Sequence, residues 1–296
     1  MPDLSLDGNV QVQKYEVDWH ESMQQTYEFY IVDPSTWKDA KQLTEVESCS
    51  ITRDASVQTL GSASFDVGES LDECYVRVYL VVIQNGFTSR FPLGTYLLQT
   101  PSAEFNGKQK RYSIDAYTPL MELKESYPPI GYSILKDTKI MPLASNLFRE
   151  HMRAPIINAK SEEKLYSNFV ANLDDTWLSF LSDLVANAKY EIKLDELGQV
   201  IFEPIVAAES LQPVKEFNDD NSSILLPTLK DDRDLYGIPN VVEVVYSTDK
   251  LHLHSRVVND DPNSPISTVV RGREIVHRDS SPKFSGTPTQ AIIDSY

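Results

Sequence analysis

The chain has 296 residues, which is about the length of two domains. Its 44 acidic and 27 basic residues give a net charge of −17, and 41% of its residues are hydrophobic. That share of apolar side chains is enough for folded cores, so the composition excludes a wholly disordered chain. The acidic excess argues against a phosphate-binding surface, which needs clustered Lys and Arg, so we expect no stable nucleic-acid binding.

The sequence gives no sign of a membrane or secretory segment. No run of about 18 consecutive apolar residues occurs, so we expect no membrane insertion by this chain. The first residues lack the basic start and the apolar stretch of a signal peptide. The two cysteines, Cys49 and Cys74, cannot make a disulfide framework. We expect both to be reduced thiols in a protein made in the cytosol.

The first 118 residues have the alternating pattern of short β-strands separated by turns. Gln84-Asn85-Gly86-Phe87 is typical of a hairpin turn. About seven strands at a spacing of roughly ten residues predict a sandwich or a barrel, and we expect an antiparallel β-barrel over residues 1–118. The segments with this pattern are 10–17, 27–32, 46–52, 62–67, 75–83, 89–93, 94–100 and 109–117.

One of these segments, Tyr75–Ile83, is apolar on both faces. Such a strand is central in a sheet or lies in an interface. We expect one face to meet the barrel core and the other to meet a neighbouring element or subunit. The candidate subunit-interface residues on this second face are Tyr75, Arg77, Tyr79, Val81 and Ile83.

Residues 119–206 are predicted to form an α+β segment. A helix is expected over 142–151, and a second one has a stripe of apolar residues at helical spacing from Trp177 to Ala188, with Asp174 or Asp175 as its cap. A hairpin of strands 190–194 and 199–203 follows the second helix directly. This order of helix and hairpin is that of a small α+β unit.

Residues 207–296 are loop-rich and acidic and predict a second, incomplete β-barrel domain. Strands are expected over 238–246, 251–258 and 272–278, and Thr287 followed by Pro288 predicts the cap of a final helix. The predicted fold class is therefore α+β, mainly β, with two antiparallel β-barrel-like domains and an α+β segment between them.

Signatures of catalysis are absent from the sequence. It contains no glycine-rich phosphate loop, no GxSxG motif and no HExxH motif. His252 and His254 lie two residues apart and could share a metal, but no third ligand comes with a motif, so surface histidines are the simpler interpretation. Both cysteines lack a CxxC motif or a neighbouring base. We expect no enzyme, no cofactor and no metal.

Two further residue sets allow a functional and a structural interpretation. Three acidic pairs could be glycosidase carboxylates or calcium ligands, but they fit a helix cap and solvated loops better. An aromatic set near the N-terminus could bind sugar, although aromatic residues on strands belong more often to a core. The sets are Asp174-Asp175, Asp219-Asp220 and Asp231-Asp232 on one hand, and Tyr15, Trp19, Tyr27, Phe29 and Tyr30 on the other.

The order of these parts resembles that of bacteriophage tail-hub (baseplate hub) proteins. Residues 50–67 and the strand leading to Gly94-Thr-Tyr-Leu look like the opening barrel of that family, and residues 176–204 resemble the α+β segment that follows it. Four short stretches resemble the second barrel of the family. They are residues 240–246, the loop 259–265, Arg271-Gly-Arg-Glu-Ile and the helix start at Thr287-Pro288.

The resemblance implies a structural protein of the virion, made in the host cytoplasm and located at the tail tip or baseplate. Such hubs are homotrimers whose two barrels per subunit form a pseudo-sixfold ring around the DNA channel. The ring joins the tail tube and distal tail proteins to a spike or fibre-like protein, with roles in host cell attachment and DNA ejection. No catalytic residues of the family exist to transfer. Hubs usually continue past the helix that begins at Thr287, so the chain is interpreted as a piece of a longer tail protein.

The charge is uneven along the chain, with −9 in residues 1–100, −2 in 101–200 and −6 in 201–296. An acidic channel wall would repel DNA phosphates, whereas an acidic exterior would only keep the protein soluble. Two alternatives to the hub stay open at this point. They are a β-rich carbohydrate- or protein-binding module and a hydrolase that uses scattered carboxylates.

Overall fold

The computed structural model describes residues 17–105, 107, 110–207, 210–213, 235–282 and 288–296. The chain divides into two compact units, Met1–Pro204 and Ile205–Tyr296. The fold is mainly β with mostly antiparallel sheets, which confirms the predicted class at that level. The predicted strand over 10–17 lies outside the described residues except for Val17.

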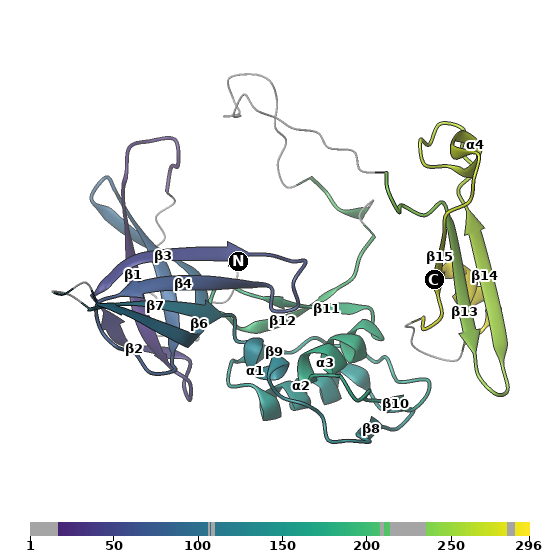
Figure 1. Ribbon diagram of the computed structural model, residues 1–296, viewed down its shortest axis with the longest axis horizontal. Coiled ribbons are helices and arrows are strands. Elements are labelled where there is room, and N and C mark those ends of the chain that lie inside the picture. The colour runs from purple at the N-terminus through teal and green to yellow at the C-terminus, as the bar shows by residue number, and fades with distance from the viewer. Residues whose placement is uncertain (1–16, 106, 108–109, 208–209, 214–234, 283–287) are drawn as a thin grey trace. The chain divides into compact units, whose positions relative to one another are not determined.

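The N-terminal part of the first unit is one antiparallel sheet (Figure 1). Its strands follow the order β2-β1-β5-β6-β7-β4-β3. Its hairpin β5–β6 turns at Asn85 and Gly86, whose φ angles of 52° and 82° are those of a type I′ turn, as the sequence predicts. The strands are β1 (Gln24–Asp33), β2 (Lys38–Leu43), β3 (Val46–Arg53), β4 (Gly61–Val67), β5 (Tyr75–Gln84), β6 (Phe87–Phe105) and β7 (Lys110–Tyr117).

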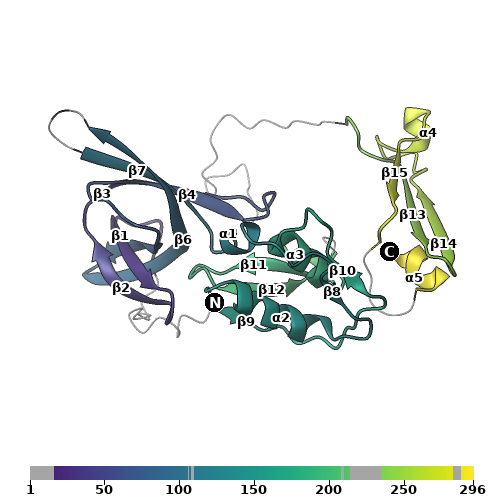
Figure 2. The ribbon, with the colours of Figure 1, turned by 60° about the horizontal axis from the view of Figure 1, so that its bottom comes forward.

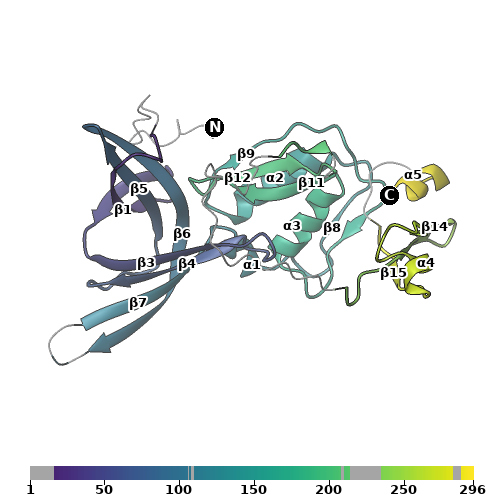
Figure 3. The same ribbon diagram turned by 90° about the horizontal axis from the view of Figure 1, so that it is seen from above.

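Strand β6 makes the sheet curl, because its first part pairs with β5 in one half of the sheet and its second part pairs with β7 in the other half. It pairs with β5 from Phe87 to Leu97 and with β7 from Leu97 to Phe105, and the register shifts opposite Val78 and again after Leu98. Such irregularities bend a strand without ending it. The segments 89–93 and 94–100, which were predicted as two strands, are therefore parts of one continuous, bent strand. Figure 3 shows the resulting curl. The core inside it holds Leu43, Ala63, Phe65, Val67, Val76, Val78, Tyr96, Leu98, Ile114 and Ala116.

The curled sheet does not close into a barrel within the described residues. Strand β2 pairs with β1 only along Phe29–Asp33, and β3 pairs only with β4. The two outer strands are therefore not hydrogen-bonded to each other, although only Thr44 and Glu45 separate them in sequence. The barrel expected over residues 1–118 is therefore not confirmed, because the described strands of this range form an open, curled sheet.

The rest of the first unit is the α+β segment, seen best in Figure 2. Helices α2 and α3 and the expected hairpin β11–β12 are present, and β12 also pairs in parallel with β9. The elements are α1 (Met121–Lys124), β8 (Ser133–Ile134), α2 (Ile140–His151), β9 (Ile156–Ile157), β10 (Phe169–Val170), α3 (Trp177–Ala186), β11 (Tyr190–Leu194) and β12 (Val200–Pro204).

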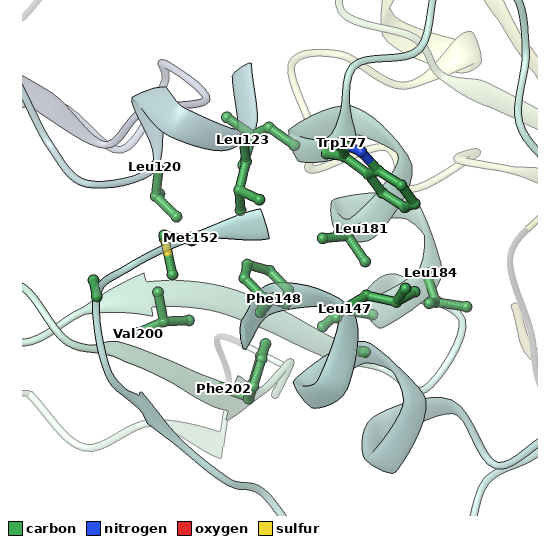
Figure 4. Packing of buried hydrophobic residues seen from close by; sticks show 14 of the residues in the cluster. Leu120, Leu123, Leu147, Phe148, Met152, Trp177, Leu181, Leu184, Val200 and Phe202 are labelled. Carbon is green, nitrogen blue, oxygen red and sulfur yellow. The ribbon is translucent and has the colours of Figure 1, made fainter. Parts of the chain in front are cut away.

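The core of this segment lies between the helices and the β11–β12 hairpin (Figure 4). The apolar stripe of α3 faces it as predicted, and the Phe148 ring of α2 meets Phe202 of β12 at 5.4 Å between ring centroids. The cap prediction for α3 was wrong. Thr176 caps the helix, and its hydroxyl accepts a hydrogen bond from the Ser179 N–H at 3.2 Å. Asp175 instead accepts the Asn172 N–H.

The second unit is a three-stranded sheet in the order β14-β13-β15, with α5 packed on it through Ile293 and Val244. Only three strands are present in its described part, and they form no barrel. Thr289 caps α5, whereas the predicted cap Thr287 lies outside the described residues. The elements are β13 (Val241–Ser247), β14 (His252–Val258), α4 (Thr268–Arg271), β15 (Val276–Asp279) and α5 (Gln290–Ser295).

A charged cross-strand group joins the three strands of this sheet. Glu243 of β13 lies directly opposite Arg256 of β14 and Arg278 of β15. Its carboxylate contacts the two guanidinium groups at 3.3 Å and 2.7 Å. The hydrogen bond and charge of Arg278 hold the pKa of Glu243 below its usual range. Opposite charges directly across a sheet stabilise the pairing of its strands.

Candidate functional site

Strand β5 lies in the middle of the curled sheet, between β1 and β6. Both of its faces are buried along most of its length, as the sequence predicts, and Val76 and Val78 belong to the core inside the curl. Four of the five candidate interface residues are covered by the chain itself. Tyr75, Arg77, Tyr79 and Val81 are at most 4% exposed, whereas Ile83, near the end of the strand, is 37% exposed.

The guanidinium of Arg77 is the centre of a buried polar group on the outer face of β5. It lies 3.0 Å from the Asp39 carboxylate of β2 and donates to the Thr95 hydroxyl at 2.9 Å and to the Trp37 carbonyl at 3.1 Å. The Tyr79 hydroxyl donates to the other oxygen of Asp39 at 2.8 Å. These partners compensate the desolvation of two charges that water does not reach.

This polar group also receives the tip of the β11–β12 hairpin. The Leu197 carbonyl accepts hydrogen bonds from the Trp37 indole at 2.9 Å and the Thr95 hydroxyl at 2.8 Å, and it lies 3.4 Å from Arg77 Nη2. One carbonyl oxygen of the α+β segment therefore meets donors from β5, β6 and the β1–β2 turn. This group of side chains, Trp37, Asp39, Arg77, Tyr79 and Thr95 together with Leu197, is called the junction below.

The sequence of the hairpin tip permits this close approach. The carboxylate of Asp195 accepts hydrogen bonds from the Leu197 and Gln199 N–H groups at 3.0 and 2.8 Å and so shapes the turn. Gly198 has a φ of 76°, and a Cβ at this position would lie 2.8 Å from the Thr95 Cβ. Only glycine avoids both the backbone strain and the clash.

Burial also affects the carboxyl that shapes the tip. The desolvation of Asp195 raises its pKa, and the hydrogen bonds from Gln199 and Leu197 oppose that rise by favouring the charged form. Burial is the larger cause, so the protonated form is favoured more in the folded chain than in the unfolded chain.

Two arginines extend the contacts of β5 beyond the junction. Arg90 of β6 lies 4.2 Å from the Tyr79 ring centroid and pairs with Glu28 at 3.0 Å. Arg153, which follows α2, lies 5.0 Å from the Tyr75 ring centroid and contacts Glu122 of α1. Cations over aromatic faces are attracted by the ring quadrupole, so both ends of the buried face are held by the same kind of contact.

The other residues singled out in the sequence are not brought together into a site. His252 and His254 lie on one face of β14, both exposed, and His252 Nδ1 is 2.7 Å from the Ser247 hydroxyl. No group of three or more His, Cys, Asp or Glu that could hold a metal occurs among the described residues. Asp174 is exposed and Asp175 is half-buried, and the other two acidic pairs fall outside the described ranges.

The described members of the aromatic set do not form a platform, and Tyr15 lies outside the described residues. Phe29 faces the core inside the curl, where its ring meets Phe65 at 6.2 Å, whereas Tyr30 faces the opposite side and meets Tyr79. Cys49 and Cys74 are half-buried free thiols, and burial raises the pKa of both to about 11. A thiol with such a pKa is a poor nucleophile at neutral pH.

Sequence reasoning did not anticipate the junction, apart from Arg77 and Tyr79 as strand residues. The available signal was an arginine inside an otherwise apolar strand, since buried arginine is rare unless it is paired. Its partners Asp39 and Leu197 are 38 and 120 residues away. No local pattern identifies partners at that separation.

The architecture is shared with solved structures of phage tail proteins. The tail protein from Neisseria meningitidis MC58 has a TM-score of 0.60 at 13% identity, over 90% of this chain and 73% of that chain. The 43 kDa tail protein of prophage MuSo2 from Shewanella oneidensis has a TM-score of 0.54 at 11% identity, over 91% of this chain and 76% of that chain. This is a phage tail protein fold.

A third structure agrees with these two. Prophage tail protein gp18 from Listeria monocytogenes EGD-e has a TM-score of 0.50 at 12% identity, over 86% of this chain and 72% of that chain. No protein-family model matches the sequence, and no curated protein sequence matches it either. The likeness therefore rests on the fold. In the described part of the chain, no helix has the length and apolar character needed to cross a membrane.

Proposed function

We propose that the chain is a structural component of a phage tail, a hub or adaptor between the sixfold tail tube and the distal baseplate or spike. The observation that carries this proposal is the extent of the structural likeness, which covers about nine-tenths of the chain in two tail proteins. A match limited to one sheet would support only a common module.

The contacts within the first unit fit a part that transmits force between neighbours. The junction fastens the curled sheet to the α+β segment by buried hydrogen bonds from Trp37 and Thr95 to the Leu197 carbonyl, and the guanidinium of Arg77 reaches the same carbonyl. In this proposal residues 1–118 and 207–296 are two barrel-like parts of a homotrimeric ring, and residues 119–206 lie between them in sequence. The exposed end of β5 at Ile83 is a candidate subunit contact.

The proposal includes the acidic charge of the chain. A tail channel must let the genome pass without holding it, and a wall rich in Lys and Arg would bind phosphates in a salt-dependent way. The net charge of −17 is suited to a wall that repels DNA. We place the protein at the tail tip or baseplate of the virion, with no enzymatic role of its own.

Two measurements test this function. Light scattering coupled to gel filtration should give three times the chain mass of 33.5 kDa, about 100 kDa, for the purified protein. Immunogold labelling in electron micrographs should place the protein at one end of the tail. A monomer that binds sugars and is missing from virions would overturn the proposal in favour of a carbohydrate-binding module.

A further inference from the structure

The β6–β7 hairpin extends beyond the rest of the curled sheet as a two-stranded arm. Strand β5 pairs with β6 only as far as Leu97, and β4 pairs with β7 only from Tyr112 onward. Towards the tip, β6 and β7 pair with each other, from Ala103 opposite Tyr112 to Phe105 opposite Lys110. This part, Ala103–Phe105 and Lys110–Tyr112, is called the arm below, and Figures 2 and 3 show that it projects past the other strands of the sheet.

The arm has an apolar face that its own chain leaves uncovered. Ala103 and Phe105 lie on one face of β6, because they are two residues apart. Tyr112 and Lys110, their partners across the hairpin, share this face. Phe105 is 71% exposed. A two-stranded ribbon without a packed face is marginally stable in water, so we expect a partner to cover it.

The same sheet has a free strand edge of matching length. Residues Gln24–Glu28 of β1 pair with β5 on one side, and β2 begins its pairing on the other side at Phe29, so no described strand pairs with them there. Residues Ser102–Phe105 of β6 likewise have no described partner strand on the side away from β7. Pro101 limits this second edge, because proline has no N–H to donate. Two such edges can pair with each other through their main chains.

An apolar groove lies beside the free edge of β1. Its volume is about 580 Å³. Tyr27 at its rim is 57% exposed, although Phe29 on the same face of β1 packs in the core. A hollow of about 950 Å³ shares Glu47 with the groove and is also lined by Glu45, so this end is acidic. The groove is lined by Tyr27, Phe29, Val46, Glu47, Ser48, Cys49, Ile51, Val78 and Leu93.

The arm is complementary to this groove in polarity and in charge. Its apolar face suits the aliphatic and aromatic lining, and Lys110 at the end of that face suits the acidic end at Glu45. Arg111, on the other face of the arm, already contacts Glu47 within one chain. Because the arm is paired along its length, it does not fold back into its own groove. We propose that the arm of one copy docks in the groove of a second copy, where its β6 edge pairs with Gln24–Glu28.

The proposed contact joins two different surfaces, an arm and a groove. Contacts of this kind close into a ring when they repeat around a rotation axis. The inference therefore rests on the homotrimer of the proposed function and adds the surfaces that join its subunits. Gln24 lies opposite Ile83 in the register of β1 and β5, so the docking edge begins beside the candidate subunit contact at Ile83.

A substitution at the tip of the arm tests the docking. Phe105→Asp changes an exposed side chain and should keep the far-ultraviolet circular dichroism of the natural chain. It brings a carboxylate to an apolar groove with an acidic end, so light scattering should show the mass falling threefold, from about 100 kDa to the chain mass of 33.5 kDa. Leu173→Asp is the matched control, because Leu173 is 83% exposed and lies outside the arm, and it should keep the mass of the natural protein.

Disulfide trapping locates the contact. In a Cys74→Ser background, Cys49 of the groove is the one natural cysteine left. Ala103→Cys, Phe105→Cys and Lys110→Cys are introduced one at a time, and oxidation is carried to completion. At least one position should link to Cys49 of another chain, because docking brings the two Cα atoms within about 7 Å. Every subunit gives one arm and receives one, so the product should run as a covalent trimer, and Cys49→Ser should abolish it.

The outcomes separate this proposal from the function on which it rests. A natural trimer whose mass Phe105→Asp leaves unchanged, with no linkage at any of the three positions, would overturn arm docking and leave the homotrimer intact. Linkage confined to one chain, or a linked product no larger than a dimer, would overturn it as well. A natural chain that is itself a monomer would reject the homotrimer, and the arm contact with it.

Discussion

Arg77 and Asp39 form an ion pair of 3.0 Å in which neither side chain is more than 1% exposed. The pair joins β5 to β2, and the same guanidinium reaches the Leu197 carbonyl at the tip of the β11–β12 hairpin. Because an isolated buried charge is strongly disfavoured, each of these two residues makes the other necessary.

Replacing Arg77 by Met should therefore destabilise the chain strongly. The change removes the guanidinium that pairs with the buried Asp39 carboxylate, and losing one partner of a buried pair costs about 3–5 kcal/mol. Urea unfolding followed by fluorescence measures the loss. Lys139→Met is the matched control, because the side chains of the Lys139–Glu162 pair are 48% and 88% exposed and such pairs contribute about 0–1 kcal/mol. Similar losses in the two variants would contradict the prediction.

The close approach at Gly198 can be separated from its backbone strain. Gly198→Ala combines a φ of 76° with a clash against Thr95, whereas Gly131→Ala has a φ of 79° and no atom within 4 Å. Both should lose about 1–2 kcal/mol from the left-handed backbone alone. Only Gly198→Ala should lose more, and the difference in unfolding free energy between the two variants measures the contact. Equal losses of unfolding free energy in the two variants would contradict the prediction, because they would show that the clash with Thr95 costs no stability.

Two substitutions on β5 distinguish folding from assembly. Val81 is 4% exposed and Ile83 is 37% exposed. Val81→Asp buries an unpaired carboxylate and should abolish the folded state or reduce its stability by several kcal/mol, a range of about 2–5. Ile83→Asp should keep the far-ultraviolet circular dichroism of the native chain and lower its mass by light scattering. An assembled Ile83→Asp trimer of normal stability would remove Ile83 from the interface.

The raised pKa of Asp195 predicts a pH dependence of stability with a definite sign. Its folded-state pKa lies above its unfolded value, so the stability it contributes is present below the unfolded pKa and is lost as pH rises through the folded pKa. The Asp195→Asn variant has no titrating carboxyl at this position. Its stability relative to the natural chain should therefore increase as the pH rises through the folded-state pKa of Asp195. Gln199 Oε1 lacks a hydrogen-bond partner among the described residues and can accept from the new amide. Urea unfolding from pH 4 upward checks this, and a parallel pH dependence in the two chains would refute it.

Purified protein should show no affinity for double-stranded DNA, even at low salt. The charge of −17 repels phosphates, and at low salt the repulsion is screened least, since the Debye length is about 30 Å at 0.01 M. A gel-shift titration at low salt measures this, with a basic DNA-binding protein as the positive control. A retarded band that disappears on adding salt would point to a basic surface and against a repelling channel wall.

Much of the local structure could be predicted from periodicity. The stripe on α3, the burial of both faces of β5 and the Asn85-Gly86 turn all follow from side chains that are close in sequence. The α3 cap shows where this reasoning stops. Asp174, Asp175 and Thr176 are all suitable cap residues. The helix begins directly after Thr176, where the Trp177 N–H donates to the Ser126 carbonyl at 2.8 Å, a contact with a residue about 50 positions earlier in the chain.

The sequence by itself determined the mainly β character, the positions of most strands and the two amphipathic helices, because these depend on patterns of two to four residues. Only the tertiary structure decided that β6 is one strand shared by two halves of a curled sheet, that the described strands leave this sheet open between β2 and β3, and that Arg77 meets Asp39 and Leu197. These features depend on contacts between residues up to 120 positions apart, which no short pattern records.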